Sequence, residues 1–464
     1  MTATPAPSPF KAYDIRGQVP HSLNEGLAER IGQGFAAIIQ PTGPVAIGRD
    51  MRLSSAPLAE ALRKGLNDSG IDTVDIGLCG TEVVYHAASR TGMGGGIMVT
   101  ASHNPADYNG MKMVREQAIP VSQDTGLKQI ENWLTQGQTA TSAPVGHHHS
   151  EDVNDEFIAR MLHGVNVDNI RPFKLVVNAG NGCAGPFFDA IARQLPVDVI
   201  RLHHEPDGQF PNGVPNPLLM ENREETAAAV RHHGADLGIA WDGDFDRCFF
   251  FDADGRFIEG YYLVGLFAAQ LIGRYPGSAI VLDPRLIWNT LEQVEQAGGT
   301  PLINKSGHAF IKERMRRDDA VYGGEMSAHH YFRDFAYCDS GMLPWLLLLE
   351  IMSSSGQSLA ELVDERIRRF PCSGEINFSV SDTQTVIDSV LKQFMPKDPV
   401  VDRTDGISLE FDEWRFNLRA SNTEPVIRLN IETRQQPQLL ADATAQLSTM
   451  IQQAGDINRS AGNR

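Results

Sequence analysis

Three observations predict a multidomain α/β protein. The chain has 464 residues, which is more than one hydrophobic core normally serves, so about three or four domains are expected. Strand-like apolar runs alternate with helical periodicity through roughly the first 370 residues, which is typical of α/β units. The remaining part combines several strand patterns with a final helix. The sequence therefore predicts three α/β domains and a small C-terminal α+β domain.

The first α/β domain is predicted over residues 1–150. Its expected elements are the strands Val45–Gly48, Thr73–Ile76 and Ile97–Val99 and the helix Leu58–Leu66. The polar stretch Thr135–Asp155 is interpreted as a linker. Its three adjacent histidines, residues 147–149, cannot share one helical face, so a solvated loop is favoured over a metal site.

Two more α/β domains are expected at 151–256 and 257–369, before the boundary segment Phe370–Glu375, which contains a Pro and a Gly. The apolar run Met342–Leu349 is too short to span a bilayer and predicts a buried helix. The C-terminal domain, 370–464, is expected to hold three strands and a last helix. The remaining elements predicted in these domains are Phe173–Val177, Tyr261–Ile272, Ala279–Leu282, Leu359–Arg368, Ile407–Phe411, Trp414–Leu418, Val426–Ile431 and Gln438–Gln453.

Composition limits the partners. With 40 basic and 58 acidic residues the formal charge is −18, which argues against nucleic acid or an anionic membrane as partner. Five cysteines without CxxC spacing suit a reducing compartment, and the first residues lack the apolar core of a signal peptide. We expect a cytoplasmic protein that catches any anionic substrate with a local basic cluster.

The stretch from Gly92 to Lys112 holds the first candidate site. Glycines lead into the strand Ile97–Val99, and Pro105 soon after prevents a helix, so Ser102 is expected on a sharp loop with an accessible hydroxyl. Asn104, Asn109 and Lys112 offer donors and a cation to a phosphoryl group on that serine. Alone, the stretch could equally be an ordinary polar turn.

Asp242, Asp244 and Asp246 follow the predicted strand Leu237–Trp241 and precede three phenylalanines. Three carboxylates at alternate positions can converge on a hard cation and leave coordination positions for a phosphate, as Mg²⁺ sites do. An EF-hand would need Gly and Glu where Arg247 and Ala253 stand. Three aspartates in a solvated turn remain the alternative.

Two further clusters suit a sugar phosphate. Glu325, Ser327 and His329 lie at alternate positions and so share one side of an extended or looped backbone, where they suit sugar hydroxyls or a buried polar cluster. Near the C-terminus, two guanidiniums and a turn of short donors form a potential phosphate cradle. The cradle comprises Arg419, Ser421, Asn422, Thr423 and Arg428.

The segment Gly180–Gly185 matches the GxGxxG form of a dinucleotide fingerprint, with Glu205 or Asp207 as the ribose acid. The motif is weak alone and lies in mid-chain beside two asparagines. A nicotinamide-dependent dehydrogenase is therefore kept only as a remote alternative.

Several motifs in register give the chain a family resemblance. FKAYDIRG at 10–17, VTASHNP around Ser102, DGDFDR at 242–247, KSGH at 305–308, GEMSAH from Gly324 and RASNTEP from Arg419 together resemble the α-D-phosphohexomutases. The bacterial phosphomannomutase/phosphoglucomutase group is the most similar, and the resemblance covers essentially the whole chain.

The resemblance implies four domains around a central cleft, the last related to the TATA-binding-protein fold. It implies Ser102 as the phosphoserine, which would hold Mg²⁺ together with Asp242, Asp244 and Asp246. Glu325 and Ser327 would bind the 3- and 4-hydroxyls of the sugar, and the C-terminal cradle the phosphate that does not react. The residues implied around the reacting end are Tyr13, Arg16, Lys112, Arg247 and His308, with Arg16, Lys112 and His308 as candidates for moving the proton.

Two residues depart from the family pattern. Ala328 stands where the group often has Gly, and Arg285 where some members have Lys. Because an arginine stays charged, Arg285 suits a phosphate clamp better than proton transfer, which favours His308 for the proton.

The reaction implied is reversible phosphoryl transfer between the 1- and 6-positions of glucose and mannose phosphates, through a bound glucose or mannose 1,6-bisphosphate. We expect a monomer. A phosphoglucosamine mutase on the same fold, and a catalytically silent sugar-phosphate-binding protein, remain alternatives.

Overall fold

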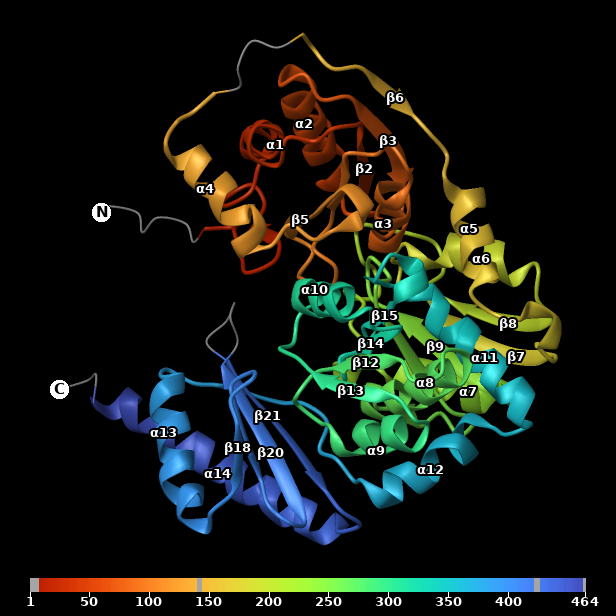
Figure 1. Cartoon of the computed structure of the whole chain (residues 1–464), viewed down its shortest axis with the longest axis vertical. Helices are drawn as coiled ribbons and strands as arrows, with labels where there is room; N and C mark the ends of the chain where they lie inside the picture. The colour runs from red at the N-terminus through yellow and green to blue at the C-terminus, as the bar shows by residue number, and fades with distance from the viewer. Residues whose placement is uncertain (1–7, 140–143, 421–425, 462–464) are drawn as a thin grey trace. The chain divides into compact units, whose positions relative to one another are not determined.

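The computed structural model describes residues 8–139, 144–420 and 426–461, and Figure 1 shows its elements. The chain divides into two compact units. The first comprises Met1–Ile258 and Ser327–Leu359, and the second Glu259–Met326 and Ala360–Arg464. The predicted third domain, 257–369, thus contributes to both units, and the four boundaries expected from the sequence stay predictions.

A six-stranded sheet forms the start of the first unit, in the order β1-β5-β4-β2-β3-β6. Helices α1, α2 and α4 share one apolar core with its strands, whereas α3 approaches β2 and β4 through Val84, beside Gly48 and Gly96. The mixed sheet confirms the α/β prediction. Its elements are β1 (Ile15–Gln18), α1 (Glu25–Ile39), β2 (Val45–Arg49), α2 (Ser55–Asp68), β3 (Thr73–Leu78), α3 (Thr81–Ser89), β4 (Gly95–Val99), β5 (Tyr108–Arg115), α4 (Leu127–Thr135) and β6 (His148–Ser150).

The prediction that Thr135–Asp155 is a linker is partly wrong. Within it, β6 pairs in parallel with β3, and His148 Nδ1 lies 3.2 Å from Thr73 Oγ1. All three residues of β6 are exposed. The strand lies at the edge of the sheet, where backbone pairing with β3 holds it. Such a strand has no apolar alternation for a sequence pattern to detect.

A second sheet of the first unit has the order β11-β10-β9-β7-β8. Strands β9 and β10 are buried along their whole length and form an antiparallel pair. The apolar helix α11 is buried as predicted. These elements are α5 (Asn154–His163), β7 (Phe173–Asn178), α6 (Ala184–Ala192), β8 (Val197–Leu202), α7 (Glu224–His233), β9 (Leu237–Trp241), β10 (Cys248–Phe251), β11 (Phe257–Ile258), β15 (His330–Phe332), β16 (Cys338–Asp339) and α11 (Met342–Ser355).

The second unit begins with α/β elements in which β12 lies parallel to both β13 and β14. Among the residues described, no helix is both long and apolar enough to cross a membrane. The elements are α8 (Gly260–Arg274), β12 (Ala279–Leu282), α9 (Trp288–Gln296), β13 (Thr300–Ile303), α10 (His308–Asp318), β14 (Tyr322–Gly324) and α12 (Leu359–Arg369).

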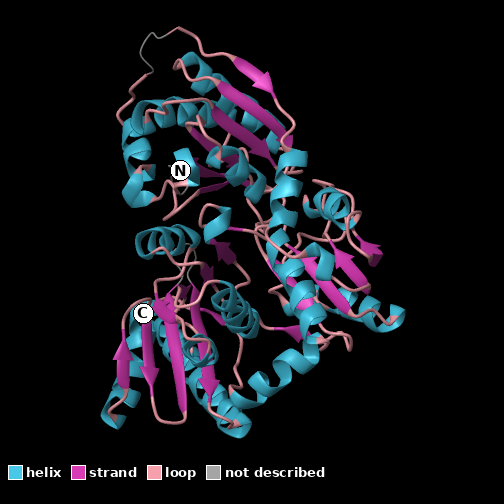
Figure 2. Cartoon of the chain, turned by 45° about the vertical axis from the view of Figure 1, so that its right-hand side comes forward, coloured by secondary structure: helices cyan, strands magenta, loops and turns pink. Residues whose placement is uncertain are grey.

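The C-terminal part of the second unit is an antiparallel sheet, β17-β21-β20-β19-β18. Helices α13 and α14 pack on one of its faces through a shared apolar core, as Figure 2 shows. The α+β prediction is confirmed, although β17, β18 and α13 were missed. The elements are β17 (Ile376–Ser379), α13 (Thr383–Phe394), β18 (Val400–Asp402), β19 (Ile407–Glu410), β20 (Trp414–Ala420), β21 (Val426–Thr433) and α14 (Pro437–Ala461).

Candidate active site

Ser102 lies on the loop after β4, as predicted, but it is not accessible: the residue is only 1% exposed. Its hydroxyl donates to Asp242 Oδ2 at 2.6 Å and lies 3.0 Å from His103 Nδ1. These two neighbours cover the side chain that small flanking residues were expected to expose. The backbone φ of Ser102 is +49°, an uncommon conformation for a residue other than glycine and one that clusters at functional sites.

Arg52 holds the serine loop, and no sequence motif marked it. Its buried guanidinium donates to four backbone carbonyl oxygens, at 2.7 to 2.9 Å. It also pairs with buried Asp50 at 3.3 Å. Since Arg52 grips the main chain at both ends of the loop, it fixes the position of Ser102. The four carbonyls belong to Ser102, Asn104, Pro105 and Tyr108.

The acidic loop between β9 and β10 brings Asp242, Asp244 and Asp246 together. All three are buried, and each offers an oxygen within 4.8 Å of the others. One oxygen of Asp244 and one of Asp246, Oδ1 in both, accept no hydrogen bond. Buried carboxylate oxygens without donors are costly unless a cation or donor meets them. The donor set therefore fits a hard cation such as Mg²⁺.

Two cations lie against this acidic loop. Lys112 Nζ donates to Asp244 Oδ2 at 2.7 Å and to Asp246 Oδ2. Arg247 donates to Asp242 Oδ2 from Nε and from a terminal nitrogen, at 2.9 and 2.7 Å. Burial alone would lower the pKa of Lys112, but Asp244 and Asp246 raise it above its ordinary value. The two aspartates therefore stabilise the charged form of Lys112.

Arg16, on β1, approaches the loop that carries Ser102. Its Nε donates to Asp14 at 2.7 Å, and a terminal nitrogen donates to the Ala101 carbonyl at 3.3 Å and to the Asn104 side chain. Its neighbour Tyr13 is half-buried. Arg16 therefore contacts the serine loop, and its place at the reacting end stays a prediction.

The predicted sugar loop crosses from one compact unit to the other: Glu325 belongs to the second unit, and Ser327 and His329 to the first. Ser327 Oγ and His329 Nδ1 are 3.5 Å apart, and His329 Nε2 lies 3.6 Å from Asp246 Oδ1. Ala328 has a φ of +70°, in the region that glycine adopts most easily. This conformation explains why a glycine would suit the position.

Within the second unit, Glu325 and Arg285 share a carboxylate-rich environment. Glu325 Oε1 accepts from the Gly307 amide at 2.9 Å, just before His308 begins α10. Arg285 donates to both oxygens of Asp283 at 2.9 Å, and its nearest nitrogen to Glu325 is 3.6 Å away. The guanidinium of Arg285 is thus hydrogen-bonded to Asp283 through two nitrogens. Its role as a phosphate clamp stays a prediction.

Glu375 joins the predicted cradle arginines and was not anticipated. Its carboxylate lies 3.2 Å from Arg285, 3.6 Å from Arg419 and 3.7 Å from Arg428. Burial alone would raise the pKa of Glu375, but the three guanidiniums lower it. The structure therefore gathers three cations on one carboxylate. The other cradle residues, Ser421, Asn422 and Thr423, lie outside the described residues.

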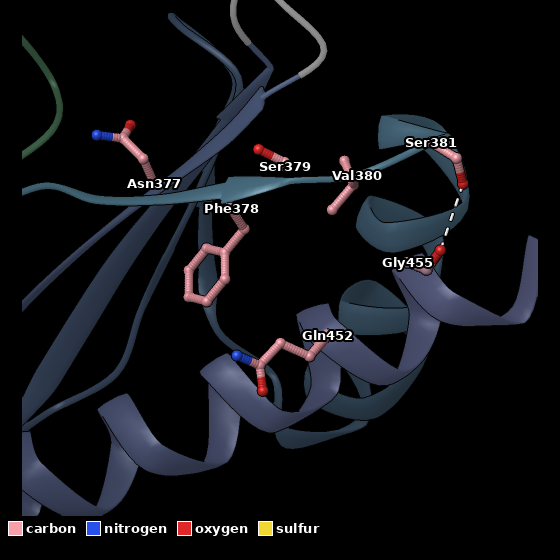
Figure 3. A pocket seen from close by; sticks show the side chains of 7 residues that line it. All are labelled: Asn377, Phe378, Ser379, Val380, Ser381, Gln452 and Gly455. Atoms are coloured by element: carbon pink, nitrogen blue, oxygen red, sulfur yellow. Dashed lines mark hydrogen bonds between the residues drawn. The ribbon is translucent and has the colours of Figure 1, made fainter. Parts of the chain in front are cut away.

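A cavity of about 300 Å³ opens elsewhere, between β17 and α14. Figure 3 shows its lining, which includes Asn377, Phe378, Ser379 and Gln452. The residues that line it carry no titratable group. It therefore offers no chemistry for phosphoryl transfer.

The glycines of the 180–185 turn are covered by the chain itself. A Cβ at Gly182, the second glycine of the motif, would lie 2.8 Å from the Gly243 carbonyl oxygen. In a dinucleotide site the second glycine would instead let the pyrophosphate approach the backbone. The geometry thus speaks against the nicotinamide alternative.

Comparisons with known proteins agree with this architecture. The chain matches the family models of phosphoglucomutase/phosphomannomutase domains: α/β/α domain I at residues 8–141, domain II at 155–255, domain III at 259–370 and the C-terminal domain at 375–447. It is 58% identical over 442 residues to "Phosphohexose mutases" of Xanthomonas campestris pv. campestris, covering 95% of this chain and 98% of the relative.

Two further comparisons extend over most of the chain. The chain is 52% identical over 449 residues to a phosphomannomutase of Escherichia coli K12, and the match covers 95% of this chain and 98% of that protein. A crystal structure of a phosphoglucomutase/phosphomannomutase family protein from Burkholderia thailandensis superposes with a TM-score of 0.86. That structure is 33% identical in sequence, with 96% of this chain and 97% of the other covered.

Proposed function

Because this chain belongs to the phosphoglucomutase/phosphomannomutase family of isomerases, we propose that Ser102 is its phosphoryl carrier in the interconversion of hexose 1- and 6-phosphates. The observation that carries the proposal is the contact between Ser102 and the acidic loop. Its hydroxyl meets Asp242 at 2.6 Å, beside two aspartates that each keep an unbonded oxygen.

The proposed reaction has two transfers. In the first, the bond between phosphorus and Ser102 Oγ breaks as the 6-hydroxyl oxygen of a hexose 1-phosphate bonds to phosphorus; the 6-hydroxyl proton passes to a base, and Ser102 Oγ takes up a proton. The bound glucose or mannose 1,6-bisphosphate then turns end over end. In the second transfer, the bond between phosphorus and the sugar 1-oxygen breaks as Ser102 Oγ gives up its proton and bonds to phosphorus; the 1-oxygen takes up a proton, and hexose 6-phosphate is left. No phosphate is gained or lost, so the reaction is an isomerisation.

The residues around Ser102 suit this chemistry through position and charge. Lys112 and Arg247 would neutralise the phosphoryl oxygens. Asp242, Asp244 and Asp246, with the Ser102 phosphate, would hold Mg²⁺, which when bound spreads the charge of the transferring group. Arg16 is paired with Asp14, and Lys112 with Asp244 and Asp246, so of the three candidates His308 is the proposed proton acceptor.

Recognition of the sugar is assigned to the remaining predicted residues. We propose that Glu325 and Ser327, with His329, bind the hydroxyls, and that Arg419 and Arg428 grip the phosphate that does not react. Glucose and mannose differ at the 2-hydroxyl, so a site that reads the 3- and 4-hydroxyls accepts both. Tyr13 and Arg16 would border the reacting end.

The test combines mass spectrometry with kinetics. A phosphoryl group should be found on Ser102, and Ser102→Ala should lose nearly all mutase activity, whereas the helical control Ser354→Ala should keep it. Chelation of divalent metal should abolish activity, and added Mg²⁺ should restore it. Full activity of Ser102→Ala, or full activity after chelation, would refute the mechanism.

Substrate preference is tested by assaying glucose, mannose and glucosamine 1-phosphates side by side. We expect turnover of the first two, and a preference for the third would assign the chain to the phosphoglucosamine alternative. No turnover of any sugar would favour a silent binding protein. A monomeric state and a cytoplasmic location are likewise proposed. The five free cysteines support a reducing compartment, and light scattering tests the oligomeric state.

A further inference from the structure

Thr81 touches the acidic loop, although no motif pointed to it. It opens helix α3 and is completely buried. Its hydroxyl donates to Asp244 Oδ2, and its backbone amide donates to the Asp244 carbonyl at 3.0 Å. Lys112 Nζ lies 3.4 Å from the same hydroxyl. Thr81 and Lys112 therefore both donate to the same oxygen of Asp244 and lie against each other.

The start of α3 is pressed against the acidic loop. A Cβ at Gly80 would lie 2.2 Å from the ring of Phe245 and 2.6 Å from the Asp244 carbonyl oxygen. Gly341, at the start of α11, is equally close, since its Cβ would lie 2.3 Å from the Phe245 carbonyl oxygen. Contact this close leaves the middle of the loop little freedom to move.

Glu82, the next residue of α3, ties the two helix starts together. Its buried carboxylate accepts from the Gly341 and Met342 amides at 3.3 and 3.1 Å and from the Ser340 hydroxyl. Acceptor oxygens at a helix N-terminus are stabilising because they meet amides that have no partner within the helix. Thr81 is thus held by an anchored helix.

From this arrangement we propose that Thr81 is a positioning residue for the cation site. Together with Lys112, its hydroxyl holds Asp244 Oδ2, fixes the rotation of the carboxylate and leaves Oδ1, which accepts no hydrogen bond, for the cation. Hydrogen bonds of this kind orient metal-binding carboxylates, and their loss typically weakens metal affinity by about 10- to 100-fold. The inference rests on the proposed role of the three aspartates as cation ligands.

The test measures Mn²⁺ binding directly, by the electron paramagnetic resonance signal of the free ion. The whole protein is compared with Thr81→Val, which keeps the shape but loses the hydroxyl, and with Thr81→Ser, which keeps the hydroxyl. Thr73→Val is the matched control, since Thr73 is also completely buried but begins β3 and accepts from the Asn67 side chain of α2. Phosphorylation of Ser102 is quantified in each sample.

We expect Thr81→Val to raise the Mn²⁺ dissociation constant by about 10-fold or more, and Thr81→Ser and Thr73→Val to stay within about threefold of the parent protein. The Mg²⁺ concentration for half-maximal activity should rise in parallel, with an unchanged KM for the sugar phosphate. If Thr81→Val does not fold, full Mn²⁺ affinity in Thr81→Ser still supports the proposal, and a loss in Thr81→Ser overturns it.

Two failures can be told apart. If the parent protein binds no Mn²⁺, the cation site itself is refuted. If the parent protein binds Mn²⁺ and folded Thr81→Val binds it equally well, the site stands and the role of Thr81 is refuted.

Discussion

Arg415 and Glu432 form a buried ion pair in the second unit, with exposures of 1% and 0% and a distance of 2.8 Å. Arg415 also donates to the carbonyls of Pro284 and Arg285 at 2.8 and 3.0 Å. It therefore supports the backbone that carries Arg285. We predict that Arg415→Met destabilises this region strongly.

The magnitude follows from what the substitution leaves behind. Glu432 would remain a buried carboxylate. Among the residues that the structure describes, its donors would be the amide of Ile287 at 2.7 Å, the amide of Trp288 at 3.2 Å and the hydroxyl of Tyr261. Removing one member of a buried pair typically costs about 3–5 kcal/mol. A loss of about 4 kcal/mol corresponds to about a thousandfold increase in the opening equilibrium.

Hydrogen–deuterium exchange suits the test because it reports the opening of each segment, whereas a chain with two compact units need not unfold in one step. Protection at the start of α9 should fall in Arg415→Met. The double variant Arg415→Met/Glu432→Gln should lose much less than the sum of its single variants, because it leaves no buried unpaired charge. Arg403→Met, at an exposed arginine, is the control and should change protection by less than about 0.5 kcal/mol.

Additive losses in the double variant would contradict the reasoning, since they would mean that the charges do not depend on each other. A loss below about 1 kcal/mol in Arg415→Met would contradict it as well. Either result would show that water or a rearranged side chain compensates Glu432.

Two further predictions concern the first unit. Burial raises the pKa of Glu82 well above its ordinary value, so folding takes up a proton between the unfolded and folded pKa values, and stability falls as pH rises through that window. Glu82→Gln should remove this pH dependence of the unfolding free energy, measured by urea titrations from pH 5 to 8. If the difference in unfolding free energy between Glu82→Gln and the parent protein stays constant with pH, the prediction is refuted. Ala328→Gly should change the unfolding free energy by less than about 1 kcal/mol. Glycine relieves the strain of the positive φ, worth about 1–2 kcal/mol. This gain offsets the loss of a buried methyl group and the greater backbone entropy of glycine in the unfolded chain. A decrease of more than about 2 kcal/mol in the unfolding free energy, measured by thermal unfolding, would contradict the prediction.

The sequence predicted best where burial is continuous. Leu237–Trp241 and Ala279–Leu282 are strands with the predicted bounds, because unbroken apolar runs identify strands buried on both faces. The acidic loop was predicted because its three carboxylates are close in sequence and need only a curled backbone to converge.

The residues that were missed depend on contacts distant in sequence. Thr81 reaches Asp244 across 163 positions, and Arg52 reaches Ser102 across 50. Neither carries a local signal, because a single threonine or arginine has no periodicity. Ser102 was expected to be exposed for the same reason, since Asp242, one of the two residues that cover it, lies 140 positions away.

The grip of Arg52 on the serine loop is made to backbone carbonyls, which every amino acid has. These contacts therefore hold the path of the loop without using the side chains of His103 or Asp107. Mutant libraries at His103 or Asp107 could vary the chemistry around Ser102 without redirecting its backbone. Substitution of Arg52 would instead release the loop as a whole. The evolvable positions of this loop and the position that holds it are thus separate, and directed evolution can vary the former while keeping the latter constant.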